Sequence, residues 1–261
     1  MSRMNNPELL YGERAQTDFV PPGNVLASSD RGAVELVDVE IFYSLFELPM
    51  SVAIARLPQS LHPSIPAVMA ANYWHAPVSP FGEFHLAYVG LACRTGIKPR
   101  HLVIGAWCDN PDAARFFRER YGFDCVAAEI QCHETFERVV GRITVGDATT
   151  LETVATDFVP IVGGGGSVKY SPPLNLALIE GQAMLAQFEA GYAFKRVLRG
   201  DARNNIYCAQ ALGDGEIAPT SPISGTFAVC DVYLLPVRFQ VDLAIPAEQG
   251  GATKIALSDV P

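Results

Sequence analysis

One stretch, residues 109–126, carries the clearest local structure signals in the chain and fixes how its neighbours can be arranged. It reads DNPDAARFFRERYGFDCV. Asn110 suits an N-cap, Pro111 occupies the first helical position, and Asp112 adds a negative charge to the first turn. Gly122 can take the left-handed conformation that ends a helix. The pattern predicts a short helix between two apolar strands.

The rest of the chain consists largely of apolar runs of strand length. Hydrophobic residues make up 49% of the chain and charged residues only 18%, which indicates a packed globular protein. A second short helix is expected at 49–57, and 174–194 fits either a helix or strand ends. Strands are expected at residues 33–46, 67–75, 83–93, 101–108, 126–130, 139–145, 152–162 and in two segments of 225–245. The pattern as a whole favours a mainly β fold.

The predicted domain organisation is simple. Residues 1–30 are polar and rich in turn residues, so we expect an N-terminal arm. Residues 31–261 show no internal repeat and no linker, and are expected to form a single domain. Within that domain, 199–224 is expected to be rich in loops and 246–261 to form a tail.

The bulk properties exclude several classes of function. The net charge is −9, whereas a nucleic-acid surface needs clustered Lys and Arg. No apolar run reaches the ~18 residues of a membrane helix, and the first residues lack the apolar centre of a signal peptide. The six cysteines form no CxxC pair, and the histidines show no HxH or HExxH spacing. We therefore expect a cytoplasmic protein that needs no cofactor or metal ion and binds neither nucleic acid nor a membrane.

The predicted helix also carries a motif. Asp109-Asn110 precedes it, and Arg118-Glu119 lies in its second half. This order resembles the signature of the acetoacetate decarboxylase superfamily, in which an Asp-Asn pair is followed by a short helix with Gly-Arg-Glu. Phe117 stands where the family has glycine. The resemblance implies a large antiparallel, cone-like β-barrel with a few flanking helices, a small-molecule substrate and assembly into homo-oligomers.

The next four residues depart from the family pattern where it determines the chemistry. The family continues with aromatic-Pro-Lys-Lys, and its first lysine forms a Schiff base with the substrate. Phe123 matches the aromatic residue, but Asp124 replaces the proline, and Cys125 and Val126 replace the lysines. Because a thiol cannot form an iminium, the resemblance implies the fold without the Schiff-base reaction.

A second match precedes an expected strand. The SPFGE sequence at 79–83 resembles the superfamily's Gly-Pro-Tyr-x-Glu, whose glutamate lies in the active site. Glu83 and His85 are two residues apart, so on a strand their side chains share one face. A carboxylate beside an imidazole can act as an acid/base pair, and we predict both residues as catalytic. An exposed strand face can also carry such residues without any catalytic role.

The charged residues of the helix allow two interpretations. Arg118 can point into a pocket and hold a substrate carboxylate or carbonyl oxygen, a task suited to its fork of donors. Alternatively, Arg118 and Glu119 are both solvated and complement the helix dipole. We predict Arg118 as catalytic and Glu119 as substrate-binding.

The remaining predicted site residues surround the position of the missing lysine. Cys125 either adds to an unsaturated carbonyl or lines the pocket as a small hydrophobic residue. Asp124 is predicted as catalytic because an apolar environment raises the pKa of a carboxyl group. His75, Trp74, Tyr73 and Trp107 lie on expected strands and can form an aromatic substrate-binding wall, although core packing explains them as well.

These residues lead to one hypothesis and two rivals. The hypothesis is an enzyme of secondary metabolism that acts on an enolisable or unsaturated carbonyl compound, either polyketide-like or a keto acid. Acid/base catalysis and substrate shaping would then give cyclisation, isomerisation or dehydration. The first rival is a decarboxylase or aldolase-dehydratase that uses another lysine, namely Lys98, Lys169, Lys195 or Lys254. The second is a barrel that binds a small molecule without catalysis.

Overall fold

The computed structural model describes residues 10–21, 32–96, 98–161, 168, 171–212 and 217–254. Its strands are β1 (Val34–Glu47), β2 (His62–Pro63), β3 (Val68–Ala76), β4 (Phe84–Thr95), β5 (Lys98–Cys108), β6 (Cys125–Ala127), β7 (Glu129–Glu134), β8 (Arg138–Val145), β9 (Ala148–Pro160), β10 (Pro173–Ile179), β11 (Gln182–Gln187), β12 (Ala190–Tyr207), β13 (Pro222–Leu234), β14 (Phe239–Asp242) and β15 (Ala252–Lys254). The helices in these ranges are α1 (Met50–Arg56), α2 (Pro111–Tyr121) and the short 3-10 helices η3 (Gln16–Asp18), η4 (Ala209–Leu212) and η5 (Ala247–Gln249). None of them is long and apolar enough to cross a membrane.

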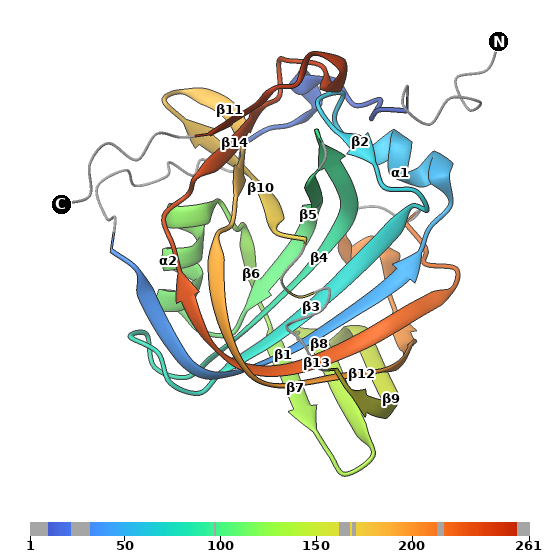
Figure 1. Ribbon diagram of the computed structural model, residues 1–261, viewed down its shortest axis with the longest axis vertical. Coiled ribbons are helices and arrows are strands. Elements are labelled where there is room, and N and C mark those ends of the chain that lie inside the picture. Colours follow the sequence, from blue (N-terminus) through green and yellow to red (C-terminus); the bar gives the residue numbers. More distant parts are fainter. Residues whose placement is uncertain are drawn as a thin grey trace.

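All of these strands belong to one large, curved sheet (Figure 1). The hydrogen-bonded order is β15-β14-β11-β10-β5-β4-β3-β1-β13-β12-β9-β8-β7, with β2 beside β4 and β6 beside β5. The long strands cross the middle of the view, and α1 and α2 lie on opposite sides of it. The prediction of a mainly β fold with few helices is confirmed.

Two details differ from a closed antiparallel barrel. First, β5 pairs in parallel with both β6 and β10, so the sheet is mixed. The chain passes from β5 to β6 through α2, and such a helical crossover brings two strands into parallel register. Second, the described ladders leave β15 and β7 as the two edges, so hydrogen bonds do not close the sheet.

The central strands are buried on both faces, and their alternate residues serve two hydrophobic cores. The β7-side core includes Phe42, Tyr73 and Trp107 and lies where β7 packs across β1, β3, β4 and β5. The α2-side core includes Trp74 and Phe117 and lies under helix α2. Because successive strand residues point to opposite faces, the sheet itself separates the two cores.

Helix α2 begins and ends where the sequence predicts, with Asn110 as its N-cap and Gly122 as its C-terminal stop. The side chain of Asn110 accepts hydrogen bonds from two backbone N–H groups of the first turn, and Gly122 ends the helix at φ +79°. The same Asn110 amide donates to the carbonyl oxygens of Phe81 and Glu83, at 3.0 and 3.2 Å. The N-cap therefore also ties the start of α2 to the turn before β4.

Three segments differ from the sequence prediction. The ambiguous region 174–194 forms β10, β11 and the start of β12, with Gly181 at φ +81° in the first turn. The region 199–224 is not loop-rich throughout, because β12 continues to Tyr207 between β9 and β13. The expected tail adds β15 to β14. β10 and β11 form a hairpin, whereas β12 pairs with β9, which is distant in sequence.

The expected N-terminal arm, 1–30, is described only at 10–21. Gly12 donates its backbone N–H to the carbonyl oxygen of Leu61 at 2.9 Å. A Cβ on Gly12 would lie 2.1 Å from the carbonyl oxygen of Leu57, so the two backbones approach closely. This part of the arm therefore docks on its own chain beside α1, and the predicted domain boundaries stay predictions.

We expect Gly141→Ala to lower the free energy of unfolding by about 1–3 kcal/mol, because the added methyl overpacks the β7-side core. A Cβ there would lie 2.4 to 2.6 Å from three ring carbons of Tyr73. That ring stacks on Phe42, and its hydroxyl lies 3.0 Å from Thr153 Oγ1, so it cannot easily shift. Gly191→Ala is the matched control, since its Cβ would meet nothing closer than 3.6 Å. Equal urea midpoints for the two variants would contradict the packing argument.

Candidate active site

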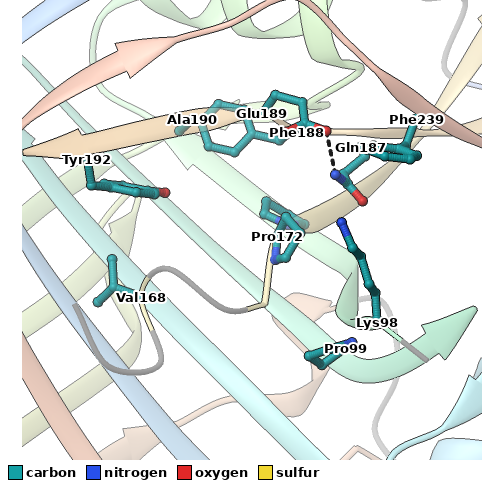
Figure 2. A pocket seen from close by; sticks show the side chains of 11 residues that line it. Lys98, Pro99, Val168, Pro172, Gln187, Phe188, Glu189, Ala190, Tyr192 and Phe239 are labelled. Carbon is teal, nitrogen blue, oxygen red and sulfur yellow. Dashed lines mark hydrogen bonds between the residues drawn. The ribbon is translucent and has the colours of Figure 1, made fainter. Parts of the chain in front are cut away.

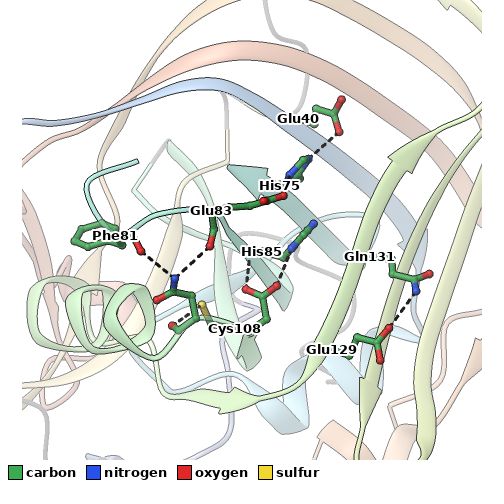
Figure 3. A network of polar contacts seen from close by, with 10 residues as sticks. Glu40, His75, Phe81, Glu83, His85, Cys108, Glu129 and Gln131 are labelled. Carbon is green, nitrogen blue, oxygen red and sulfur yellow. Dashed lines mark hydrogen bonds and ion pairs between the residues drawn. The ribbon is translucent and has the colours of Figure 1, made fainter. Parts of the chain in front are cut away.

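A row of acidic and imidazole side chains crosses neighbouring strands at one end of the sheet. The register pairs Glu40 of β1 with His75 of β3, and His75 with His85 of β4. Glu83 immediately precedes β4, and Asp109 immediately follows β5. Figure 3 shows Glu40, His75, Glu83 and His85 gathered in one place. The sheet register thus brings together five groups that can exchange protons.

His75 lies between two carboxylates. Its Nδ1 is 3.2 Å from Glu40 Oε2, and its Nε2 is 2.9 Å from Glu83 Oε1. The His75 side chain is 22% exposed, so the group is accessible from solvent. Hydrogen bonding at both nitrogens is complete when the ring carries a proton on each of them.

His85 has a single carboxylate partner. Asp109 Oδ2 lies 2.7 Å from His85 Nδ1, and Asp109 Oδ1 accepts the backbone N–H of His85, also at 2.7 Å. The carboxylate therefore fixes the orientation of the ring and accepts the hydrogen bond of the Nδ1–H group. No other described residue hydrogen-bonds His85 Nε2, which is left as the basic nitrogen.

The two imidazoles face each other as a stacked pair. The ring centroids of His75 and His85 are 4.5 Å apart and the planes differ by 10°. One ring is bonded at both nitrogens and the other at one, so the two differ in what they can donate or accept. Different surroundings of paired titratable groups are typical of acid/base sites.

Across 32–96, 98–161 and the other described ranges, no group of three or more His, Cys, Asp or Glu side chains is placed to hold a metal ion.

The predicted pair of Glu83 and His85 lies in this network, but not by the predicted contact. Because β4 begins at Phe84, Glu83 is outside the strand, and the two-residue spacing does not place it beside His85. Its carboxylate instead contacts His75, which stacks on His85. His75 was expected in the aromatic wall, and neither its contact with carboxylates nor the roles of Glu40 and Asp109 were recognised in the sequence. Only the register of β1, β3, β4 and β5 shows these residues as neighbours.

The predicted residues of helix α2 lie at the surface. The guanidinium of Arg118 is 3.3 Å from Asp124 Oδ1 and donates to the carbonyl oxygen of Cys125 at 3.4 Å. The Arg118 and Asp124 side chains are 45% and 62% exposed, and Glu119 is exposed as well. These three residues are not brought together with the histidine pair.

Cys125 packs against the α2-side core, on the face of the sheet opposite the histidines. His75 and His85 alternate along their strands with residues of that core, so the sheet lies between them and the thiol. Burial raises the pKa of the Cys125 thiol, the nearby Cys108 raises it further, and Arg118 lowers it. The thiol is therefore protonated at neutral pH.

The predicted aromatic wall is divided between the two cores. Trp74 belongs to the α2-side core, whereas Tyr73 and Trp107 belong to the β7-side core. The Tyr73 hydroxyl is bonded to Thr153 inside its core. Adjacent strand residues cannot line the same pocket, so these three side chains do not form one wall.

A cavity of about 320 Å³ lies in another part of the molecule, where β5 begins and β11 leads into β12 (Figure 2). None of the predicted site residues lines it. Of its lining residues only Lys98 was named from the sequence, as a possible amine of the rival decarboxylase, because the walls come from segments that are distant in the chain. The lining residues are Lys98, Pro99, Val168, Pro172, Pro173, Gln187, Phe188, Glu189, Ala190, Tyr192 and Phe239.

Solved structures with the same fold are known. A structure of acetoacetate decarboxylase matches with a TM-score of 0.69 at 12% sequence identity, covering 79% of this chain and 88% of that one. Acetoacetate decarboxylase from Legionella pneumophila matches with a TM-score of 0.65 at 16% identity, covering 86% and 95%. The enduracididine biosynthesis enzyme MppR complexed with pyruvate matches with a TM-score of 0.65 at 15% identity, covering 81% and 91%. No protein-family model and no curated protein matches the sequence. The resemblance to the superfamily is confirmed at the level of the fold.

We expect Cys125 to react slowly with iodoacetamide at pH 8, at least about tenfold more slowly than free N-acetylcysteine, because the thiolate is the nucleophile and burial raises the thiol pKa. Mass spectrometry of peptides after timed labelling measures the rate for each cysteine. The labelling rate of Cys208, which is half-exposed like Cys125, is the internal comparison. Rapid labelling of Cys125 would contradict this prediction and would favour a nucleophilic role for the thiol.

Proposed function

We propose that this chain is a small-molecule enzyme that transfers protons at the carbon next to a carbonyl group, without a Schiff base. The observation that carries the proposal is the stacked pair of His75 and His85, each hydrogen-bonded to a carboxylate. The shared fold with acetoacetate decarboxylase and with MppR supports a carbonyl compound as the substrate class.

His85 is the proposed base. The Asp109 carboxylate holds its Nδ1–H, so the lone pair of Nε2 is available to a substrate C–H. When Nε2 takes the proton, the ring becomes cationic, and Asp109 stabilises that charge at 2.7 Å. The electrons of the broken C–H bond pass into an enolate of the substrate.

His75 and Glu83 are the proposed acid side of the site. The Glu83 side chain is 65% exposed and contacts His75 Nε2, so it can pass a proton between that imidazole and a bound substrate. Return of the proton at a different carbon gives isomerisation, and loss of a β-hydroxyl as water gives dehydration. Attack of the enolate on a second carbonyl of the same molecule gives cyclisation, and all three reactions remain within the proposal.

The absence of a lysine at position 125 supports a reaction without an iminium. Among the described lysine side chains, Lys195 is exposed and bound to Asp38 and Asp231 at 2.6 Å. Lys98 lines the cavity described above, and this observation favours it as the amine of a lysine-dependent decarboxylase, the second candidate function. Lys169 and the Lys254 side chain lie outside the described residues.

The other predicted roles do not enter this mechanism. Arg118 and Asp124 are paired with each other at the surface, and Cys125 lies beyond the sheet, so the proposed proton transfer does not use them. Assembly into homo-oligomers, a cytoplasmic location and a role in secondary metabolism stay predictions from the sequence.

The test is deuterium uptake from D2O, followed by NMR, at the carbon next to the carbonyl of 2-oxobutanoate and pentane-2,4-dione. We expect catalysed exchange by the unmodified chain and a loss of about 10²-fold or more in His85→Gln, which removes the base. Asp109→Asn should lose a similar factor, because the amide can no longer hold the proton on Nδ1. His133→Gln, at an exposed histidine of β7, is the matched control and should keep full exchange.

Two outcomes would overturn the proposal. Exchange that is equal in His85→Gln and the unmodified chain would exclude the histidine as the base. A borohydride-reduced adduct on a lysine, detected by mass spectrometry after incubation with a keto acid, would establish the lysine-dependent candidate instead. Loss of that adduct in Lys98→Met would identify the amine.

A further inference from the structure

The cavity at the start of β5 shares no residue with the histidine network and has the character of a separate ligand site. Its volume of about 320 Å³ lies within the range of roughly 300–1,000 Å³ that is typical of small-molecule pockets. Most of its lining is apolar, and its few polar side chains face the same space (Figure 2). This combination is typical of small-molecule sites.

The cavity walls are flat and firmly held. Phe188 is only 1% exposed, and its ring centroid is 4.8 Å from that of Tyr121 and 5.9 Å from that of Trp74. Tyr192 packs edge-on against Trp74 and stacks on Phe194. Phe188 is covered by these rings and supports the wall from behind, whereas Tyr192 and Phe239 are half-exposed. The rings of Tyr192 and Phe239 therefore offer faces to the cavity, and the space between them suits a planar ligand.

A lysine without an ion-pair partner among the described residues lies at the edge of this space. The ammonium group of Lys98 sits 5.1 Å from the centre of the Phe239 ring. None of the ion pairs among the described residues includes Lys98, and its charge acts on Glu189 only from beyond ion-pair distance. In a chain of net charge −9, such an ammonium over an aromatic ring is suited to an anionic group.

The carboxylate of the cavity, by contrast, is already engaged. Arg100 donates to Gln187 Oε1, and Gln187 Nε2 donates to Glu189 Oε1, both at 2.5 Å. The positive charges of Arg238, Lys98 and Arg100 all act on Glu189 and lower its pKa, although burial raises it more. Three cations around one carboxylate favour a negatively charged ligand over a cationic one.

The opposite side of the cavity offers a hydrogen-bond donor. Figure 2 shows the Tyr192 hydroxyl directed toward the middle of the group of lining residues. Burial raises the pKa of Tyr192, so the phenol keeps its proton and can donate it. The cavity therefore has a cation at one end, a neutral donor at the other and flat apolar walls between them.

We propose that this cavity binds a flat, conjugated carboxylate, with its carboxylate on Lys98, its planar part against Phe239, and an acceptor oxygen on the Tyr192 hydroxyl. The inference does not rest on the proton-transfer function proposed above, because it concerns binding alone. It assigns Lys98 to recognition of an anion, in contrast to a role as a Schiff-base amine.

Isothermal titration calorimetry with 4-methoxycinnamate tests the proposal on the whole chain. We expect saturable binding, at least about tenfold tighter than binding of the neutral 4-methoxycinnamamide, because only the acid makes a charge-assisted contact. Lys98→Met should weaken binding of the acid about tenfold and leave the amide unchanged. Tyr192→Phe should weaken binding of both compounds several-fold.

Lys195→Met is the matched control, since it also removes one positive charge but at a surface site held by two carboxylates. It should leave both affinities unchanged. Equal affinity of the acid and the amide, an unchanged affinity of the acid in Lys98→Met, or tighter binding of the cation 4-methoxyphenethylamine would each overturn the proposal. Thermal unfolding midpoints within a few degrees of the unmodified chain show that the variants are folded.

Discussion

The alternation of side chains along β1, β3, β4 and β5 is the constraint on which the rest of the structure depends. The middle parts of these strands are buried on both faces, so their hydrophobic residues belong alternately to the β7-side core and the α2-side core. Tyr73 and Trp74 are neighbours in sequence and yet lie in different cores. A register shift of one residue would exchange the two faces, which is why the packing of large side chains on both sides fixes the strand pairing.

The histidine network lies at the end of these strands, where the β7-side core gives way to solvent. Ion pairs at such half-exposed positions contribute only about 0–1 kcal/mol to stability. Three carboxylates arranged around two stacked imidazoles are therefore poorly explained as a device for stability. The same geometry orients two proton-transfer groups at little energetic cost, and this supports its interpretation as a reactive site.

The fold is shared with acetoacetate decarboxylase, although position 125 holds a thiol where the superfamily signature has a lysine. The two observations are compatible because a fold holds its shape through its cores and its register, whereas a reaction depends on a few side chains. Cys125 fits against the α2-side core as a small hydrophobic residue, so the replacement leaves the packing satisfied. The structure has a cavity and a row of polar side chains that share no residue.

The sequence by itself determined the mainly β class, helix α2 with both its caps, and most strand positions, because caps, glycine stops and apolar runs act through neighbours in the chain. It also singled out Glu83 and His85. Only the tertiary structure decided that Glu83 contacts His75, that Asp109 holds His85, and that Lys98 faces Tyr192 across a cavity. These contacts join residues on different strands, and their pairing depends on register and sheet curvature, which no local spacing encodes.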